Sequence, residues 1–428
     1  MSTKTINVGY MSRVEGEAAL TIKLRGDDVV SAELSIFEPP RLFEAMLRGR
    51  LYSEAPDMTA RICGICPVAY QMSSCHAMED ALGITISPEI RALRRLLYCG
   101  EWIESHVLHM VMLHAPDFFD VPDVAGLAQL HPERVKDALR IKKLGNSILR
   151  VLGGREIHPI NVKVGGFYKA PTREDLTSLL PELNWALGAA EELLTWGQTF
   201  SYPDVAHNYL HVALCHPNEY PLNEGKIVSS AGLSINASDY EQHFAETHEE
   251  RSNALHTTHR GQTMFCGPLA RFVLNYEKLP TRAKEAATRA GVNPNCRNPF
   301  KSLLVRGVET IFALDEAIRV VEAYEPPTRA FETATPRAGV GCAATEAPRG
   351  LLYHRYHLDD SGLITDAKIV PPTSQNQRVM EEDLYRMGKM LAALPSETAR
   401  KRAEQAIRNY DPCISCATHF LDLRVERV

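Results

Sequence analysis

The sequence predicts a mainly α-helical protein, a large multihelical body with small antiparallel β-sheets at its periphery. Long stretches with apolar residues three or four positions apart indicate the helices. Two shorter stretches, residues 17–37 and 350–370, alternate apolar and polar residues around turns rich in Gly and Asp, which indicates hairpins. No internal repeat divides the chain, so we expect a single domain over residues 1–428.

The individual elements follow from local signals, taken in chain order. The hairpin at 17–37 has its turn at Gly26-Asp27-Asp28. Ser87 and Pro88 are a helix-start signal, and the apolar positions after them extend that helix to about residue 114. The second hairpin turns at Asp359-Asp360-Ser361-Gly362. Further helices are expected over 176–198, 308–323, 376–393 and 397–408.

Residues 202–275 differ in composition from the rest of the chain. Pro, Gly, Asn and His are frequent there, and the apolar residues show little periodicity. We expect a loop- and strand-rich subdomain within the single domain.

Composition and charge exclude several classes of protein. The chain has 428 residues, 45 % of them hydrophobic, and a formal net charge of −6, which argues against nucleic acid or an anionic membrane as partner. No apolar run is long enough for a membrane span or fits a signal peptide. The ten cysteines are spread along the chain rather than packed as in a disulfide scaffold. We therefore expect a cytoplasmic protein with reduced thiols.

Two C-x-x-C pairs are the strongest chemical signal. Cys63 and Cys66 lie in Arg61-Ile62-Cys63-Gly64-Ile65-Cys66-Pro67, and Cys413 and Cys416 lie near the other end of the chain. Three interpretations compete: a four-cysteine zinc site, thioredoxin-like redox chemistry, and a catalytic transition-metal site. Zinc modules usually have a much shorter gap between their pairs, and no βαβ pattern supports the redox interpretation. Soft thiolates suit nickel and iron, but spacing alone does not choose the metal.

The sequence motifs around the cysteines resemble those of the large subunit of nickel–iron hydrogenases. The matching segments occur in family order and cover nearly the whole chain. They are Arg13-Val14-Glu15-Gly16, Arg41-Leu42-Phe43-Glu44, RICGICP at 61–67, Gly154-Arg155-Glu156-Ile157-His158-Pro159, Gly267-Pro268-Leu269-Ala270-Arg271, Glu346-Ala347-Pro348-Arg349-Gly350, Pro372-Thr373-Ser374-Gln375-Asn376 and DPCISCATH at 411–419. Within the family, the sequence is most similar to the cytoplasmic NAD(P)-linked sulfhydrogenase-type alpha subunits.

The resemblance implies an enzyme that reversibly cleaves dihydrogen at a nickel–iron centre whose iron carries cyanide and carbon monoxide. By position, Cys63 and Cys413 would be terminal nickel ligands, and Cys66 and Cys416 would bridge the two metals. Glu15 would relay the proton released at Cys413. Arg349, flanked by Pro348 and Asp411, would lie over the open side of the metals and donate to one cyanide. Thr373 would donate to the other cyanide.

The resemblance also implies a magnesium site and a processing step. Glu44, the backbone carbonyl near Ile369 and His419 would hold Mg²⁺ together with water, which is normal coordination for this ion. Residues 420–428 would be a propeptide that a maturation endopeptidase removes after His419 once nickel is present.

Partner chains are implied because this chain has no further cysteine cluster for iron–sulfur centres. Electrons would pass to a small iron–sulfur subunit and then to diaphorase subunits that bind flavin and NAD(P). Three alternatives remain open: a deazaflavin-reducing hydrogenase, a non-catalytic relative such as the quinone-site subunit of respiratory complex I, and a zinc-binding scaffold. The cysteine pairs argue against the second.

Two positions depart from the family pattern, and two sets of residues have no assigned chemistry. Tyr70 stands where many relatives have His, and Ser105 where many have Asp. His106, His109 and His114 share one helix, where packing in the core is the favoured interpretation. Six further cysteines are expected to be buried apolar thiols: Cys75, Cys99, Cys215, Cys266, Cys296 and Cys342.

Overall fold

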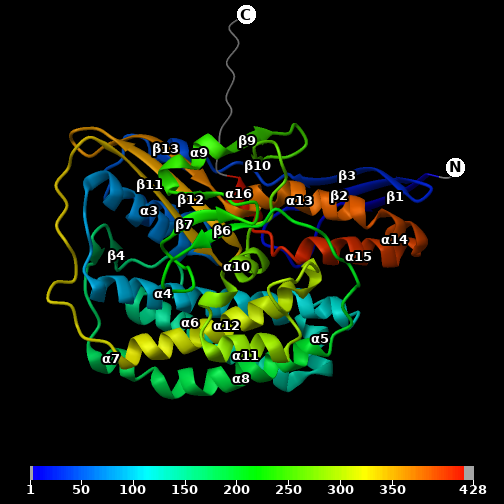
Figure 1. Ribbon diagram of the computed structural model, residues 1–428, viewed down its shortest axis with the longest axis horizontal. Helices are drawn as coiled ribbons and strands as arrows, with labels where there is room; N and C mark the ends of the chain where they lie inside the picture. Colours follow the sequence, from blue (N-terminus) through cyan, green and yellow to red (C-terminus); the bar gives the residue numbers. More distant parts are fainter. Residues whose placement is uncertain (1–2, 419–428) are drawn as a thin grey trace, which may run out of the picture.

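The computed structural model describes residues 3–418 (Figure 1). A layer of long helices fills the lower half of Figure 1, with α4 packed between α6 and α12, and α8 closing the far side. Gly100 and Gly145 let α4 and α6 approach closely, because a Cβ on Gly145 would lie 2.7 Å from the Gly100 carbonyl oxygen. The members of this layer are α4 (Pro88–Val107), α6 (Pro132–Gly153), α8 (Leu180–Gln198), α11 (Thr281–Arg289) and α12 (Ser302–Glu322).

The helix expected from Ser87 to about residue 114 is present, but its last part changes its hydrogen bonding. The Ser87 side chain accepts a hydrogen bond from Ile90 N at 3.3 Å, as an N-cap does. After Val107 the chain continues as a π-helical segment, Leu108–His114, and then as the 3₁₀ turn Ala115–Phe118. Such π-helical segments are rare and often mark functional sites.

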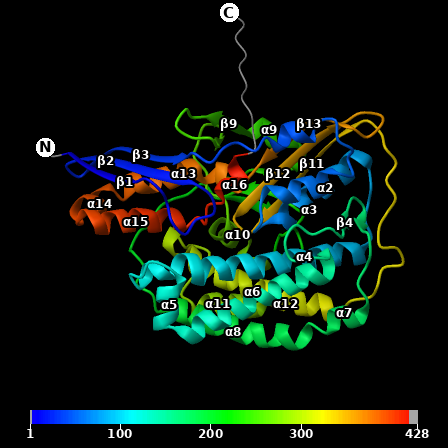
Figure 2. The ribbon, with the colours of Figure 1, turned by 180° about the vertical axis from the view of Figure 1, so that it is seen from behind.

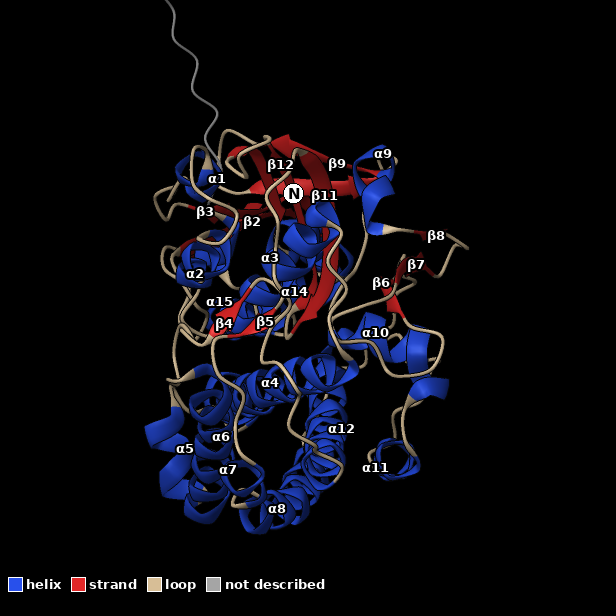
Figure 3. Cartoon of the chain, turned by 90° about the vertical axis from the view of Figure 1, so that its left-hand side faces the viewer, coloured by secondary structure: helices blue, strands red, loops and turns tan. Residues whose placement is uncertain are grey.

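A three-stranded antiparallel sheet lies above the helical layer, as Figure 3 shows from the side. It consists of β11 (Gly339–Ala347), β12 (Gly350–Leu358) and β13 (Ile364–Val370). The hairpin predicted at 350–370 is therefore confirmed, whereas β11 was not predicted. Helix α3 (Pro67–Leu82) packs against β11 and β12 on the side visible in Figure 2.

The first hairpin is also confirmed, and it gains a third strand. The antiparallel sheet contains β1 (Thr3–Val8), β2 (Ala18–Arg25) and β3 (Asp28–Ile36), with Leu20 opposite Leu34 in the central pair. Helix α13 (Pro372–Arg386) packs on β3, and α15 (Ser396–Arg408) packs on β1. This unit extends sideways from the body, beside the N-terminal end of the described chain (Figure 1).

Residues 202–275 form short strands, two short helices and connecting loops. Some of their apolar side chains join those of β11–β13 in a cluster separate from the main core, with Leu214, Tyr240 and Tyr353 buried in it, and the others belong to the main core. The segment thus packs onto the central sheet, and its status as a subdomain stays a prediction. Its elements are β6 (Val212–Cys215), β7 (Lys226–Ser229), β8 (Ser234–Ile235), α9 (Tyr240–His243), β9 (Phe244–His248), β10 (Leu255–His259) and α10 (Pro268–Asn275).

The remaining expected helices are present with shifted bounds. A turn at Ser178 separates two helices within 176–198, and the helix predicted at 308–323 starts already at Ser302. In the described chain no helix combines the length and apolar character that crossing a membrane requires. The other short elements are α1 (Phe43–Leu47), α2 (Ala55–Thr59), α5 (Val124–Leu130), α7 (Arg173–Thr177), α14 (Gly388–Ala393), α16 (Ile414–Ala417), β4 (Val162–Lys163) and β5 (Gly166–Phe167).

Candidate metal centre

Each cysteine pair lies at the start of a helix. Cys66 is the residue before α3, and Cys413 is the residue before α16, which contains Cys416. In the first pair, the backbone N–H groups of Ile65 and Cys66 donate to Cys63 Sγ, at 3.3 and 3.4 Å. The tight turn that starts the helix therefore directs both sulfurs of a C-x-x-C pair to the same side.

The two pairs meet at one buried point. The Sγ atoms of Cys63 and Cys413 are 3.4 Å apart, those of Cys66 and Cys416 are 3.7 Å apart, and those of Cys413 and Cys416 are 2.6 Å apart. All four sulfurs lie within 4.8 Å of one another, and no cysteine of the four is more than 3 % exposed. Four thiolates bonded at about 2.3 Å around metal ions need this kind of proximity.

Contacts of three residues near the N-terminus, at positions 15, 16 and 41, hold the two cysteine loops in place. Ile414 N donates to the Glu15 carbonyl oxygen at 2.9 Å, in an isolated parallel bridge between Glu15 and Cys413. Gly16 has a φ of +90°, and a Cβ there would lie 2.7 Å from the Ile414 Cβ. Arg41 donates to the carbonyl of Ile62, at 2.6 Å, and to that of Ser415, which ties one cysteine loop to the other.

The electrostatics of the four thiols favour a bound cation. Burial raises the pKa of Cys413 and of Cys416 well above the usual range, whereas hydrogen bonds, first from Cys413, lower the pKa of Cys63. Four thiolates together would therefore be unstable here without a positive charge, and a metal ion that deprotonates its thiol ligands supplies one. The donor set and its burial fit a soft transition-metal centre.

The Glu15 carboxyl lies against this cluster. Its Oε2 is 3.1 Å from Cys413 Sγ and accepts a hydrogen bond from Ser415 N at 3.0 Å. Burial, and then the neighbouring Cys63, raise the pKa of Glu15. A carboxyl with a raised pKa next to a thiol is suited to take up and release a proton.

Arg349 and Asp411 form a buried ion pair beside the cysteines. Arg349 Nε donates to the Asp411 carbonyl oxygen at 2.8 Å and lies 3.2 Å from Asp411 Oδ2. Although burial opposes the charge, Asp411 and the thiols raise the pKa of Arg349. Its Nη1 has no hydrogen-bond partner within the described residues. A guanidinium fixed in this way keeps a donor available for a ligand in the site.

Thr373, in the first turn of α13, contacts the backbone of Cys413. Its Oγ1 accepts a hydrogen bond from Cys413 N at 2.9 Å. The hydroxyl hydrogen is then available to a second acceptor.

A buried cluster of charges that the sequence reasoning missed supports Arg349. Arg271 is completely buried, and its guanidinium pairs with Glu309 at 2.8 Å and with Glu346 at 2.9 Å. The same guanidinium donates to the carbonyl oxygens of Ala347 and Pro348, at 2.7 and 2.9 Å. Arg271 thus fixes the backbone that leads into Arg349. The sequence places Arg271 at the end of a family motif but gives no signal of this role.

The structure tests the expected magnesium ligands only in part. Glu44, in α1, accepts a hydrogen bond from Ile369 N at 2.7 Å, so the carboxylate lies next to the expected backbone position. Burial raises the pKa of Glu44. The contact uses the Ile369 amide rather than a carbonyl, and His419 lies outside the described residues. The magnesium site stays a prediction.

The other residues singled out in the sequence are mostly part of the core. The Tyr70 ring lies 5.7 Å from the His354 ring, and burial followed by the nearby thiols raises the Tyr70 pKa. His106, His109 and His114 are all buried, as expected. The six remaining cysteines are free thiols, of which Cys75, Cys99 and Cys266 are buried and Cys215, Cys296 and Cys342 are partly exposed.

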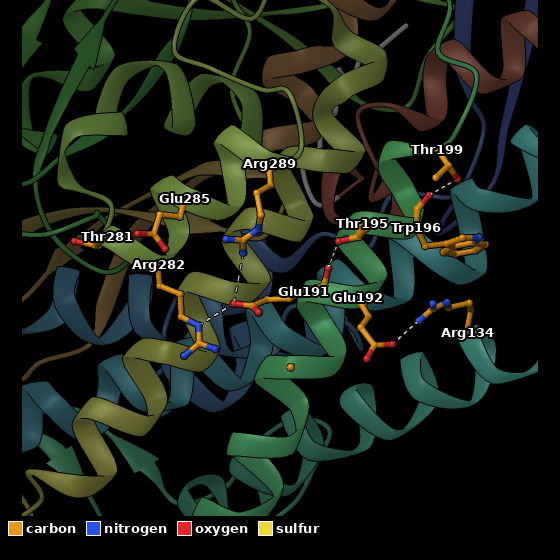
Figure 4. Close-up of a pocket in the computed structure, with 11 residues that line it drawn as sticks. Arg134, Glu191, Glu192, Thr195, Trp196, Thr199, Thr281, Arg282, Glu285 and Arg289 are labelled. Carbon is orange, nitrogen blue, oxygen red and sulfur yellow. Dashed lines mark hydrogen bonds and ion pairs between the residues drawn. The ribbon is translucent and has the colours of Figure 1, made fainter.

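A large open groove lies away from the cysteines, between α8 and α11 (Figure 4). It has a volume of about 1150 Å³, and none of the predicted site residues lines it. Most of its charged side chains pair with each other: Arg282 Nε contacts Glu191 at 2.9 Å, and Arg134 contacts Glu192 at 2.9 Å. The groove contains no cysteine and gives no reason to move the candidate site.

Comparisons with known proteins agree with the cysteine site. The sequence profile of the family described as nickel-dependent hydrogenase matches residues 41–136 and 231–419. The chain is 33 % identical to the sulfhydrogenase 2 subunit alpha of Pyrococcus furiosus, with 98 % of this chain and 100 % of that protein covered. It is 28 % identical to the NAD-reducing hydrogenase HoxS subunit beta of Cupriavidus necator, over 98 % and 96 % of the two chains. The structure of an NAD⁺-reducing [NiFe]-hydrogenase in its H₂-reduced state superposes with a TM-score of 0.89 at 26 % identity, over 98 % and 100 % of the chains.

Proposed function

This chain belongs to the nickel-dependent hydrogenase family as the catalytic subunit of a nickel–iron hydrogenase, and we propose that it couples dihydrogen to NAD(P) through partner subunits. The observation that carries the proposal is the convergence of Cys63, Cys66, Cys413 and Cys416 at one buried point. A structural zinc site would also bind four thiolates, but its function would not require ionisable groups such as Glu15 and Arg349 next to the metal.

The four cysteines would hold the metals, with Cys63 and Cys413 as terminal nickel ligands and Cys66 and Cys416 as bridges to iron. When bound, the nickel–iron centre supplies the site at which dihydrogen yields two protons and two electrons. Glu15 Oε2, 3.1 Å from Cys413 Sγ, is placed to accept a proton at that sulfur. Its raised pKa suits both uptake and release of that proton.

Arg349 and Thr373 would orient the cyanide ligands of the iron. Both offer a hydrogen that the described protein does not use, Arg349 through Nη1 and Thr373 through its hydroxyl. Asp411 keeps the guanidinium fixed, and Arg271 anchors the carbonyl of Pro348 beside it. A buried acceptor left without a donor would cost about 1–3 kcal/mol, so fixed donors at both positions stabilise the bound centre.

Electron transfer would need partner chains. Within residues 3–418 the four site cysteines are the only group of three or more His, Cys, Asp or Glu residues placed to hold a metal, so the described residues offer no second site for an iron–sulfur cluster. We propose a small iron–sulfur subunit as the direct electron acceptor, followed by flavin-containing diaphorase subunits that bind NAD(P). The names of the sulfhydrogenase and NAD-reducing relatives support this choice over a deazaflavin acceptor. A cytoplasmic location stays a prediction.

Metal analysis and infrared spectroscopy of the purified complex test the proposal. We expect about one nickel and one iron per chain, together with cyanide and carbonyl bands, since four thiolates suffice for one binuclear site. Cys416→Ser should abolish nickel binding, whereas Cys99→Ser, a control at a buried thiol of α4, should leave it intact. Zinc in place of nickel, or nickel retained in Cys416→Ser, would refute the assignment.

The magnesium site and the C-terminal processing are further proposals. Glu44, the backbone at Ile369 and His419 would hold Mg²⁺, and an endopeptidase would cut after His419. The family match ends at residue 419, which supports that cleavage position. Mass spectrometry of nickel-loaded, active enzyme decides the point, because a C-terminus at Val428 would rule out removal of residues 420–428.

A further inference from the structure

Four buried polar side chains form a cluster next to the metal site, at the junction of the π-helical segment, α12 and the loop before Cys413. They are His109, His114, Arg306 and Asn409, and none is more than 2 % exposed. Seven of their side-chain nitrogen and oxygen atoms have no hydrogen-bond partner among residues 3–418. These atoms are His109 Nδ1, both ring nitrogens of His114, Arg306 Nε and Nη2, and Asn409 Nδ2 and Oδ1.

Direct contacts show that the four residues are neighbours. Arg306 Nη1 donates to the Asn409 carbonyl oxygen at 3.0 Å. His109 Nε2 is 2.7 Å from the carbonyl oxygen of Arg408, the residue before Asn409. The ring centroids of His109 and His114 are 5.1 Å apart. The four side chains that contain the unpaired atoms therefore lie together in one buried region.

Such a concentration of unpaired buried atoms requires bound water. Each unsatisfied group costs about 1–3 kcal/mol, so seven of them would cost as much as the roughly 5–15 kcal/mol that stabilises a folded protein. A buried water molecule makes about three hydrogen bonds, so two or three water molecules could satisfy most of the cluster. The wide π-helical turn at Leu108–His114 brings His109 and His114 into this region.

The cluster has one end at the metal site and the other at the surface. Asn409 is two residues from Asp411, the partner of Arg349. At the His114 end, Asp117 interacts electrostatically with the His114 ring, and it pairs with Arg408 at 2.7 Å and with Arg13. Asp117, Arg408 and Arg13 line a surface cleft of about 500 Å³.

We propose that His109, His114, Arg306 and Asn409 bind a chain of water molecules that carries protons between the Asp411 side of the metal site and the cleft at Asp117. This route would be separate from Glu15, and it rests on the hydrogenase function proposed above. Oxidation of one dihydrogen releases two protons and two electrons. The electrons leave through the partner subunit, one proton leaves through Glu15 and the other through the water chain.

The two histidines are chemically suited to this task. Burial lowers the pKa of His109 well below its usual value and that of His114 to about 3, so both rings are neutral at neutral pH. A neutral imidazole has one N–H donor and one acceptor nitrogen. Both ring nitrogens of His114 lack a protein partner among the described residues, so His114 can take a proton at one nitrogen and release one at the other. His109 Nε2 donates to the Arg408 carbonyl oxygen, which leaves Nδ1 to accept a hydrogen bond from a water molecule of the chain.

A high-resolution crystal structure of the purified holoenzyme tests the water chain without any activity measurement. We expect ordered water molecules hydrogen-bonded to at least three of the four side chains. A dry cluster, with the seven atoms paired to protein or left unpaired, would overturn the proposal. This readout does not depend on turnover. If the protein lacks activity or nickel but contains the ordered water molecules, the proposed function is contradicted and the binding of water by the cluster is still supported.

Isotope exchange between D₂ and solvent tests the transport of protons. In a Glu15→Gln background, His114→Phe should lower the remaining exchange on the order of a hundredfold, the size expected for loss of a group that transfers protons. Asn409→Leu provides a second variant if His114→Phe folds poorly. His131→Phe is the matched control, because His131 packs between Phe119 and Trp196 and lies outside the cluster. If both double variants keep the exchange rate of Glu15→Gln alone, the second route does not exist.

Discussion

Arg271→Met removes the buried cation that holds the backbone beside Arg349. In the wild type, Arg271 pairs with Glu309 and Glu346, and it also donates to the carbonyl oxygens of Ala347 and Pro348. Met fills a similar volume but leaves two buried carboxylates without a counter-charge. Removal of the Arg271 guanidinium should therefore lower the free energy of unfolding and shift the position of Arg349.

The size of the effect can be worked from these contacts. Breaking a buried ion pair by removing one partner costs about 3–5 kcal/mol, and each hydrogen bond from a charged donor adds about 1.5–3 kcal/mol before the losses overlap. A total of about 5 kcal/mol is a conservative expectation. With an unfolding entropy of about 2.1 cal/mol/K per residue, a chain of this length loses about 6 °C in Tm for that amount.

Calorimetry of the metal-free chain measures this shift, with Arg282→Met as the matched control. Arg282 contacts Glu191 at the same 2.9 Å distance, but its side chain is 46 % exposed, so the control should change the free energy of unfolding by less than about 1 kcal/mol. In the holoenzyme, Arg271→Met should also shift the cyanide infrared bands, because Arg349 loses its anchor. Equal changes in Tm for the two variants would show that the Arg271 cluster is not a structural support.

Three further predictions concern the site itself. Glu15→Gln should keep the nickel content and the fold but slow exchange of D₂ with solvent by about 10²–10⁴-fold, and a wild-type rate would show that Glu15 is not the relay. Arg349→Lys should bind nickel yet lack activity, because an ammonium cannot contact both the Asp411 carbonyl and a ligand of the iron as a planar guanidinium can, and full activity in this variant would refute that role. Burial lowers the folded-state pKa of His114 from 6.5 to about 3, so the stability that depends on its neutral form is complete above pH 6.5 and is lost as pH falls toward 3. His114→Phe should therefore reduce the loss of stability over this range by up to about 1.4 kcal/mol per pH unit, measured by denaturant unfolding at several pH values, and an unchanged slope would show that His114 does not titrate this way.

Local patterns in the sequence determined most of the elements near the site. Two hairpins were predicted correctly because alternation and turn residues are short-range signals. The helix from Ser87 was predicted from its cap and its proline. The strands β1 and β11 were missed, because each pairs with a hairpin strand and carries little signal of its own.

The sequence also identified the chemistry of the site, because four cysteines within family motifs are specific. Cys63, Cys66, Cys413 and Cys416 were predicted from the sequence as ligands of one centre, and the structure brings their sulfurs within 4.8 Å of one another. Residue type and spacing alone left the metal open. The motifs around the cysteines, which occur in family order, favoured nickel and iron.

Only the tertiary structure decided which ordinary residues support that centre. Arg41 joins the two cysteine loops, and Arg271 anchors the segment before Arg349. Both lie in motifs that the sequence resemblance identified, but the sequence alone assigned neither of them a role. His109 and His114 also read as core residues, and their unpaired nitrogens appear only when the chain is folded. These roles arise from contacts between segments that are tens to hundreds of residues apart. The energy of a buried charge or polar atom depends on the partners that folding brings to it rather than on its neighbours in the chain.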